Sequence, residues 1–283
     1  MIRALSAQYP ASIVCDLLGC SRSSFYYQPV VNPEEAEVLA AIERLLMRRP
    51  FYGYRRVTAQ LKREGWAIGE TRVRRLLRQL DHSASVGRVR VATTDSDHDE
   101  PRFTNRVKGL AITRPNQVWV ADITYIRLGR RFIYLAVILD AFTRALRGWH
   151  LSRSLETENL TRQALEMALA RHPAPAIHHS DQGKQYAAAA YRHLLPDSTQ
   201  VSMSAVGQPT ENGLAERFIR TLKEEHIDYS EYQGFDDAFM QLAHWLEVEY
   251  MTERIHSALG YLTPAEFEAR LASPQPDPLL MQA

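Results

Sequence analysis

The spacing of hydrophobic positions divides the chain into a helical first part and a strand-rich second part. Val73, Leu76, Leu77 and Leu80 recur at i, i+3, i+4 and i+7, which predicts a helix with one buried stripe. From residue 115 the pattern changes to continuous apolar runs of strand length, separated by short polar segments. We therefore expect helices up to about residue 80 and an α/β arrangement after residue 115.

The second part contains five strand-like segments. The first two, 118–127 and 131–140, are joined by Leu128-Gly129-Arg130, which predicts a hairpin. The elements expected after them are strands 145–151, 176–180 and 200–203 and helices 156–170, 187–195 and 212–225. Three strands in sequence, then alternating helices and strands, indicate a mixed five-stranded sheet flanked by helices. The first strand is apolar on both faces, so we expect it in the centre of the sheet.

The first eighty residues contain two helical units, at about 6–28 and 50–80. In the first unit a helix stops at Gly19 and Ser21 caps a second, short helix, which is the layout of a helix-turn-helix. A helical hairpin used only for packing has the same pattern. In the second unit several arginines lie off the buried stripe and are expected to contact DNA; a packing helix with solvated arginines is the alternative. The expected DNA-contacting residues of this unit are Arg55, Arg56, Arg72 and Arg75.

The net charge of +1 conceals an uneven distribution of charge along the chain. Residues 41–80 carry eleven Lys and Arg against three Asp and Glu, whereas residues 115–283 carry fifteen against twenty-one. A basic segment joined to an acidic one fits a nucleic-acid-binding module attached to a metal-binding core. A solvated basic face is the other interpretation of the first segment.

These patterns predict a modular chain. The expected parts are a helix-turn-helix DNA-binding region at 1–80, a linker at 81–114, a catalytic core at 115–230, a C-terminal helical extension at 231–272 and a flexible tail at 273–283. The only two cysteines, Cys15 and Cys20, exclude a disulfide framework. No apolar run reaches the roughly 18 residues of a membrane span, so we expect a cytoplasmic protein without a membrane partner.

Three acidic residues stand where apolar side chains are expected. Asp122 interrupts a strand, Asp181 lies at the end of another, and Glu216 borders the buried stripe of a helix. An ionised carboxylate that is buried without a partner is unfavourable, and three of them together suit a hard divalent cation. An i,i+4 salt bridge with Arg220 is the alternative for Glu216 alone. Arg220 and Lys223 share the face of Glu216 and are expected to contact DNA phosphates.

Five motifs in order resemble those of insertion-sequence transposases with a retroviral-integrase-like core. Trp119–Tyr125 is similar to the box of the first aspartate, and His179–Tyr186 to the HSDxGxQY box. Met203–Glu216 resembles the MSxxGxxxDNxxxE box, with Glu211 in place of its aspartate. Tyr52–Arg56 resembles the upstream helix-turn-helix box, and Tyr250–Pro264 the C-terminal YNxxRxHxxLGxxTP box. The resemblance covers nearly the whole chain.

The resemblance implies a ribonuclease-H-like fold and a transposase that cleaves and joins DNA strands. It implies that Asp122, Asp181 and Glu216 are the catalytic triad and hold two Mg²⁺ ions, with Mn²⁺ as a substitute. We expect Asp122 to bridge the ions and the other two acids to complete their shells. The expected partners are double-stranded DNA of the transposon ends and target, further copies of the chain on DNA, and an upstream-frame DNA-binding protein as fusion or partner.

Two other functions compete with this one. A catalytically inactive or domesticated DNA-binding protein would use only the N-terminal helices, yet it has no need to keep three buried carboxylates. An RNA-cleaving nuclease of the same fold is disfavoured by the helix-turn-helix units. The expected location is the cytoplasm of a bacterium, on the nucleoid when bound to DNA.

Overall fold

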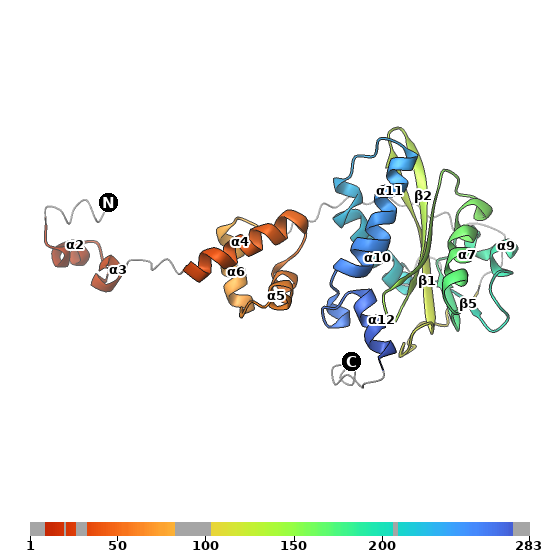
Figure 1. Ribbon diagram of the computed structural model, residues 1–283, viewed down its shortest axis with the longest axis horizontal. Helices are drawn as coiled ribbons and strands as arrows, with labels where there is room; N and C mark the ends of the chain where they lie inside the picture. The colour runs from red at the N-terminus through yellow and green to blue at the C-terminus, as the bar shows by residue number, and fades with distance from the viewer. Residues whose placement is uncertain (1–8, 20, 27–32, 83–102, 206–208, 274–283) are drawn as a thin grey trace. The chain divides into compact units, whose positions relative to one another are not determined.

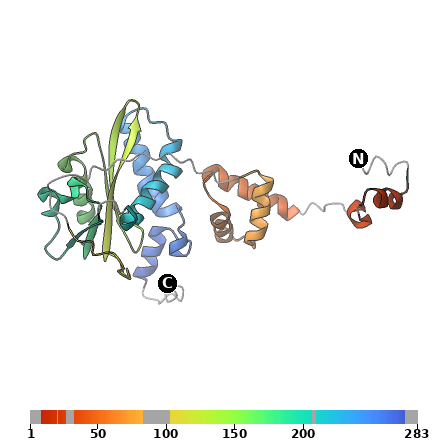
Figure 2. The same cartoon turned by 180° about the vertical axis from the view of Figure 1, so that it is seen from behind.

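The computed structural model describes residues 9–19, 21–26, 33–82, 103–205 and 209–273 (Figures 1 and 2). The chain forms two compact units, 1–48 and 49–283, and each is described by itself. Most of the expected linker and nearly all of the expected tail lie outside the described residues.

The described residues of the first unit form three helices, α2 (Ala11–Leu17), α3 (Arg22–Tyr26) and α4 (Pro33–Arg48). The first two agree with the predicted helical pair, and Gly19 adopts the left-handed conformation expected at the stop. Helix α4 was not predicted. Its sequence carried the signals of a helix, because Glu34 and Glu35 lie in its first turn and Arg48 in its last, where they suit the helix dipole.

The second unit begins with α5 (Tyr54–Arg63) and α6 (Glu70–Gln79), which pack against each other. The predicted stripe of α6 is buried at Val73, Leu76 and Leu77. The exposed arginines of α6 therefore lie on the opposite side from its packing face.

The core of the second unit is a five-stranded sheet. Its strands are β1 (Val118–Leu128), β2 (Arg131–Asp140), β3 (Leu146–Ser152), β4 (Ile177–Ser180) and β5 (Gln200–Met203), in the order β3-β2-β1-β4-β5. The first three are antiparallel, and β4 and β5 run parallel to β1 and to each other. Strand β1 is central, as its two apolar faces predicted. The hairpin between β1 and β2 turns at Gly129, whose φ of 58° is left-handed.

Helices cover both faces of the sheet. In both views α7 (Thr161–Arg171) and α9 (Ala189–Arg192) lie on one side, and α10 (Gly213–Glu225) and α11 (Phe235–His244) on the other. The remaining elements are short helices η1 (Thr157–Asn159), α8 (Lys184–Ala187), η2 (Pro209–Asn212), η3 (Ile227–Tyr229) and η5 (Ser257–Leu259), the π-helix η4 (Trp245–Glu253) and α12 (Pro264–Ala272).

Two predicted helices are divided in the structure. The segment 156–170 is a 3₁₀ turn followed by α7, because Leu160 has non-helical angles between them. Of the predicted helix 187–195, only Ala189–Arg192 forms a helix, α9; Ala188 before it has an extended ψ of 136°, and Ala187 ends the separate helix α8. Helical spacing of apolar residues does not reveal a single residue that leaves the helical conformation.

The apolar core extends beyond the limits expected for the catalytic domain. Ala238, Leu242 and Trp245 of the expected C-terminal extension are buried in the same cluster as β1, β2 and α10. Before the sheet, Phe103 and Val107 of the expected linker pack against the core as well. Both flanks therefore contribute to the domain that holds the site.

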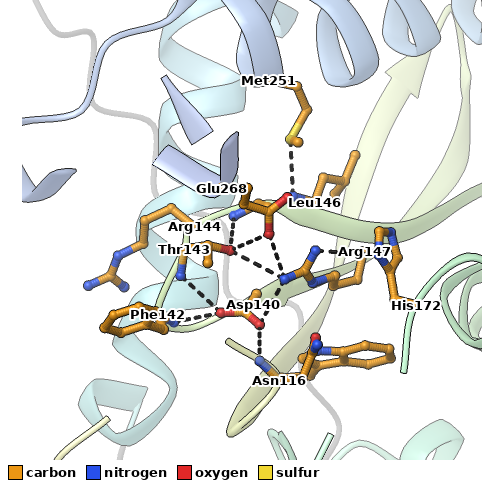
Figure 3. A network of polar contacts seen from close by, with 12 residues as sticks. Asn116, Asp140, Phe142, Thr143, Arg144, Leu146, Arg147, His172, Met251 and Glu268 are labelled. Atoms are coloured by element: carbon orange, nitrogen blue, oxygen red, sulfur yellow. Dashed lines mark hydrogen bonds and ion pairs between the residues drawn. The ribbon is translucent and has the colours of Figure 1, made fainter. Parts of the chain in front are cut away.

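A buried ionic network joins the end of β2 to α12 (Figure 3). Asp140, which is fully buried, accepts hydrogen bonds from the backbone N–H groups of Asn116, Phe142 and Thr143. Its carboxylate also pairs with Arg147 at 3.1 Å, and Arg147 pairs with Glu268 at 2.7 Å. A buried acid with this many partners serves to hold the structure together.

In the described part of the chain, no helix has the length and the apolar character that crossing a membrane requires.

Candidate active site

Sheet register brings the first two acids together. Strands β1 and β4 are parallel, and Ala121 pairs with Ser180. Asp122, within β1, follows Ala121, and Asp181, just after the end of β4, follows Ser180, so the two acids lie at the same level of neighbouring strands. Asp181 also stands where β4 ends, and its Oδ1 accepts a hydrogen bond from the N–H of Gly183 at 3.0 Å. Carboxyl ends of strands are where open α/β sheets place their ligands.

The third acid is held next to the same pair of residues. The Asn212 side chain, buried at the start of α10, donates from Nδ2 to the carbonyl oxygen of Ala121 at 3.1 Å. Glu216 lies in the first turn of α10. The expected stripe next to it is buried, but Glu216 itself is exposed, so the expectation that all three carboxylates are buried was wrong for this residue. Its exposure leaves it accessible to a ligand.

The charges of neighbouring acids raise the pKa of Asp122 and of Glu216. Burial raises the pKa of Asp122 well above its usual range, and the charges of Asp181 and Glu216 raise it further. A hydrogen bond from the N–H of Ile123, at 2.8 Å, and the charge of Lys223 act in the opposite direction. Within the described regions Asp122 has no ion-pair partner, in contrast to Asp140. Among the described residues, the charge of Asp122 is therefore not neutralised by direct contact with an arginine or a lysine.

The pKa of Glu216 is also raised, but less than that of Asp122. Partial burial raises the pKa of its carboxyl, Arg220 lowers it, and the charge of Asp181 raises it. The i,i+4 salt bridge considered for Glu216 and Arg220 is not formed within 4 Å among the residues described. Arg220 therefore acts on Glu216 only through its charge.

The donor set suits a hard divalent cation, although the side chains do not form a closed cage. Among the described residues, no three His, Cys, Asp or Glu groups are close enough to hold one ion. Two polar atoms at this level, Tyr186 Oη and Asn212 Oδ1, are buried without a hydrogen-bond partner. Burial raises the pKa of Tyr186 well above 10, and the charges of Asp122 and Asp181 contribute to this shift. Three carboxylates and two unpaired oxygens fit oxygen-preferring cations.

A polar network fixes the turn that precedes α10. The Glu211 carboxylate accepts hydrogen bonds from the N–H of Ala205 and from Asn105 Nδ2, both at 2.8 Å, and from Lys108 at 3.3 Å. These bonds lower the pKa of Glu211 to about 2. The buried ring of His179 lies between Ser202 Oγ, at 2.9 Å, and the carbonyl oxygen of Glu211, at 3.1 Å. The network connects both ends of the segment leading to Glu216.

The sequence did not indicate this network. Asn105 and Lys108 fall in the expected linker, where no apolar period marks them as part of the core. Glu211 was noted only as a departure from a motif. A polar residue that bonds across about a hundred positions leaves no periodic signal in the chain.

The expected DNA-contacting residues lie in two places. Arg55 and Arg75 are exposed and Arg72 is half-buried on α5 and α6, while Arg220 is exposed and Lys223 half-buried on α10 with Glu216. Arg56 differs from them, because its guanidinium donates to Glu225 at 3.2 Å.

Comparisons with known proteins identify three regions. Residues 112–209 and 197–264 match two families described as integrase core domain, and residues 33–90 match an HTH-like domain. The first two matches contain all three acids. Among solved structures, the chain is similar to the simian T-cell lymphotropic virus intasome with the PP2A regulatory subunit B56 gamma, with 20% identity, a TM-score of 0.48 and coverage of 80% of this chain and 75% of that one. It is also similar to the catalytic core domain of HTLV-2 integrase in complex with magnesium, with 18% identity, a TM-score of 0.41 and coverage of 54% and 96%.

Relatives at higher identity span between 77% and 93% of the chain. The chain is 35% identical to an uncharacterized 31 kDa protein of insertion element IS600 from Shigella sonnei, over 91% of this chain and 98% of the relative. It is 32% identical to the transposase for IS904 of Lactococcus lactis, over 77% and 87%, and 31% identical to transposase InsF for IS3A of Escherichia coli, over 93% and 95%. With an integrase core on a ribonuclease-H-like sheet and these relatives, the chain belongs to the IS3-type transposases of insertion sequences, polynucleotidyl transferases of DNA transposition.

Proposed function

We propose that Asp122, Asp181 and Glu216 are the catalytic residues of this transposase and that they bind its divalent cations. The observation that supports this most strongly is the electrostatic state of Asp122. Its pKa is raised by burial and by the charges of the other two acids, and Asp122 itself forms no ion pair within the described regions. Such clustered acids are costly to the fold and persist where a cation neutralises them.

Each acid has a separate part in the proposed site. Asp122, whose pKa the charges of the other two acids raise, would serve both of two Mg²⁺ ions, and Asp181 and Glu216 would each serve one of them; Mn²⁺ could replace Mg²⁺. When bound, the ions supply the Lewis acidity that activates a water or a DNA 3′-hydroxyl and stabilises the leaving oxygen at phosphorus. The pairing of Ala121 with Ser180 between β1 and β4 orients Asp122 and Asp181. The hydrogen bond from Asn212 to Ala121 orients the helix that carries Glu216.

The substrate is double-stranded DNA at the ends of the element and at the target. Arg220 and Lys223 follow Glu216 along α10 and meet the phosphates next to the acids, whereas Arg55, Arg72 and Arg75 on the helix-turn-helix meet the phosphates or bases of the end. Two ends must be joined, so several copies of the chain act together on DNA. An upstream-frame DNA-binding protein, fused or separate, completes end recognition.

A matched pair of glutamines tests the assignment. Glu216→Gln removes one charge and keeps the shape of the side chain, whereas Glu224→Gln makes the same change on the same helix, about 12 Å further along its axis. We expect Glu216→Gln to lower Mg²⁺-dependent cleavage and joining of a duplex carrying the element's end by about 1,000-fold or more, and Glu224→Gln to stay near wild type. Wild-type joining by Glu216→Gln would sink the assignment. Metal-independent DNA binding without any cleavage by the wild type would favour the inactive DNA-binding alternative.

A further inference from the structure

Two of the sequence motifs, far apart in the chain, contact each other in the folded second unit. The segment 49–63 contains the Tyr52–Arg56 motif, and the segment 225–266 contains the Tyr250–Pro264 motif. Arginines of the first segment pair with glutamates of the second at three points. We call this set of contacts the clasp.

The central point of the clasp is buried. Glu225, at the last residue of α10, accepts hydrogen bonds from Arg56 at 3.2 Å and from Arg254 at 2.6 and 2.7 Å. The side chains of Glu225 and Arg254 are 7% and 6% exposed. Arg56 also lies over the ring of Tyr52, 5.3 Å from its centre. Two cations thus share one carboxylate that is removed from water, so losing the carboxylate would leave both uncompensated.

Tyr52 adds an apolar anchor to this point. It is 1% exposed, and its hydroxyl accepts a weak hydrogen bond from the N–H of Ile255, at 3.4 Å. Burial, with the charges of Arg254 and Arg56, lowers the pKa of the neighbouring His256 to about 2. His256 is therefore neutral and adds no third positive charge beside the two arginines.

The other two points lie on either side. Arg49 donates to Glu249 and to Glu253 of the π-helix, each at 2.5 Å, and is 11% exposed. Arg63 pairs with Glu266 at 2.5 Å and donates to the carbonyl oxygen of Tyr261 at 3.1 Å. A π-helix is rare and often marks a functional position.

We infer that the clasp docks the helix-turn-helix of α5 and α6 onto the catalytic core, and that Arg49, Arg56 and Arg63 are docking residues. An arginine whose donors are already bound to carboxylates within the chain is not available to neutralise a DNA phosphate. This inference replaces the expected DNA contact of Arg56. The expected DNA contacts of Arg55, Arg72 and Arg75 are not part of this inference.

The position of Glu225 gives the clasp a consequence for the reaction. Glu225 ends the helix whose first turn carries Glu216, about 14 Å away along the axis. A DNA end held by α6 is therefore presented to the acids at a set distance and orientation, which is what strand joining requires. This consequence rests on the proposed function, whereas the docking itself does not.

Inverting the charges of the ion pairs between Arg49 and Glu249 and Glu253 tests the docking in the full chain. Arg49→Glu places three acids together, and the triple variant Arg49→Glu, Glu249→Arg, Glu253→Arg restores attraction with the signs exchanged. We expect Arg49→Glu to increase amide hydrogen exchange about tenfold in peptides 49–56 and 249–256, since two charge-assisted hydrogen bonds are lost. The triple variant should return both peptides to wild-type exchange. Arg49→Gln, which removes the attraction without adding repulsion, should give an intermediate increase.

Strand joining by the same variants separates docking from the proposed chemistry. Arg49→Glu should lower joining of the element's end about 10- to 100-fold, and the triple variant should recover it. The control Arg220→Glu, at an exposed position outside both peptides, should weaken DNA binding without changing exchange in either peptide. Unchanged exchange in Arg49→Glu, or loss of DNA binding that the triple variant does not recover, overturns the clasp. If hydrogen exchange in the variants changes as expected but the wild type does not join DNA strands, the result would count against the proposed function and not against the clasp.

Discussion

Replacing Asp122 by asparagine should stabilise the metal-free protein. Asparagine has nearly the same size as aspartate but carries no charge, so it removes the repulsion from Asp181 and Glu216 and the cost of burying an anion. It also keeps an oxygen that can accept the hydrogen bond from the N–H of Ile123. Most substitutions at buried polar positions destabilise, and a gain in stability would therefore be specific to clustered charge.

The size of the gain follows from the raised pKa of Asp122. A group whose pKa is higher in the folded state opposes folding once it ionises, so wild-type stability falls as the pH rises from the unfolded pKa, about 3.9, to the raised folded value. Within that window the loss is about 1.4 kcal/mol per pH unit. Each such unit corresponds to about 3–6 °C in melting temperature for a domain of this size. Asp122→Asn should lack this pH dependence.

Magnesium should reverse the order of stability. A cation that binds only the folded wild type adds about 1.4 kcal/mol at ten times its dissociation constant, and the variant should gain little because it lacks the central ligand. The assay is thermal unfolding, followed by fluorescence, with EDTA and with Mg²⁺ over a range of pH. This readout does not depend on catalysis.

Asp140→Asn is the matched control for the same chemical change. Asp140 is another acid on the sheet, fully buried where Asp122 is half-buried, and it is paired with Arg147 and bonded to three backbone N–H groups. Its replacement should destabilise by on the order of 3 kcal/mol, because Arg147 loses a buried partner. If Asp122→Asn were destabilising like Asp140→Asn and kept the full magnesium shift, the argument for a charged cation site would be refuted.

Three further changes test the packing and the surroundings of the site. Gly148→Ala should lower stability by about 1–3 kcal/mol in denaturant unfolding, because the new methyl group would meet the Ala164 carbonyl and lie 2.9 Å from the backbone of Ala168; an unchanged midpoint would contradict this packing. Glu211→Ala should slow strand joining about 10- to 100-fold in initial-rate assays with little change in metal-free melting, since it frees the turn before Glu216; full activity would show that the turn needs no anchor. Arg220→Ala should weaken DNA binding equally for all sequences and reduce the salt dependence by about one unit in binding titrations, and a selective effect on one sequence would assign it to base contacts instead.

Local pattern was enough to predict much of the fold. Period-two and continuous apolar runs predicted all five strands, and the two apolar faces of β1 placed it in the centre, because burial on both sides leaves no position for polar side chains. The helices with a clear buried stripe, such as α6 and α10, also agree with the structure. Elements interrupted by single residues, at Leu160 and Ala188, were predicted as continuous helices, since periodicity averages over a window.

The sequence by itself determined which residue types are available to the site, and only the tertiary structure decided which of them meet. Asp122 and Asp181 are 59 positions apart, and they lie at one level because β4 pairs in parallel with β1 at Ala121 and Ser180. Arg56 and Arg72 are both arginines near a helix-turn-helix, yet Arg56 is bound to Glu225, 169 positions away. Hydrophobic spacing reports on neighbours one or two turns apart, whereas ion pairs and strand register bring distant residues together without any periodic trace. That physical difference is why the sequence could suggest the acids as site residues but gave no sign of the clasp.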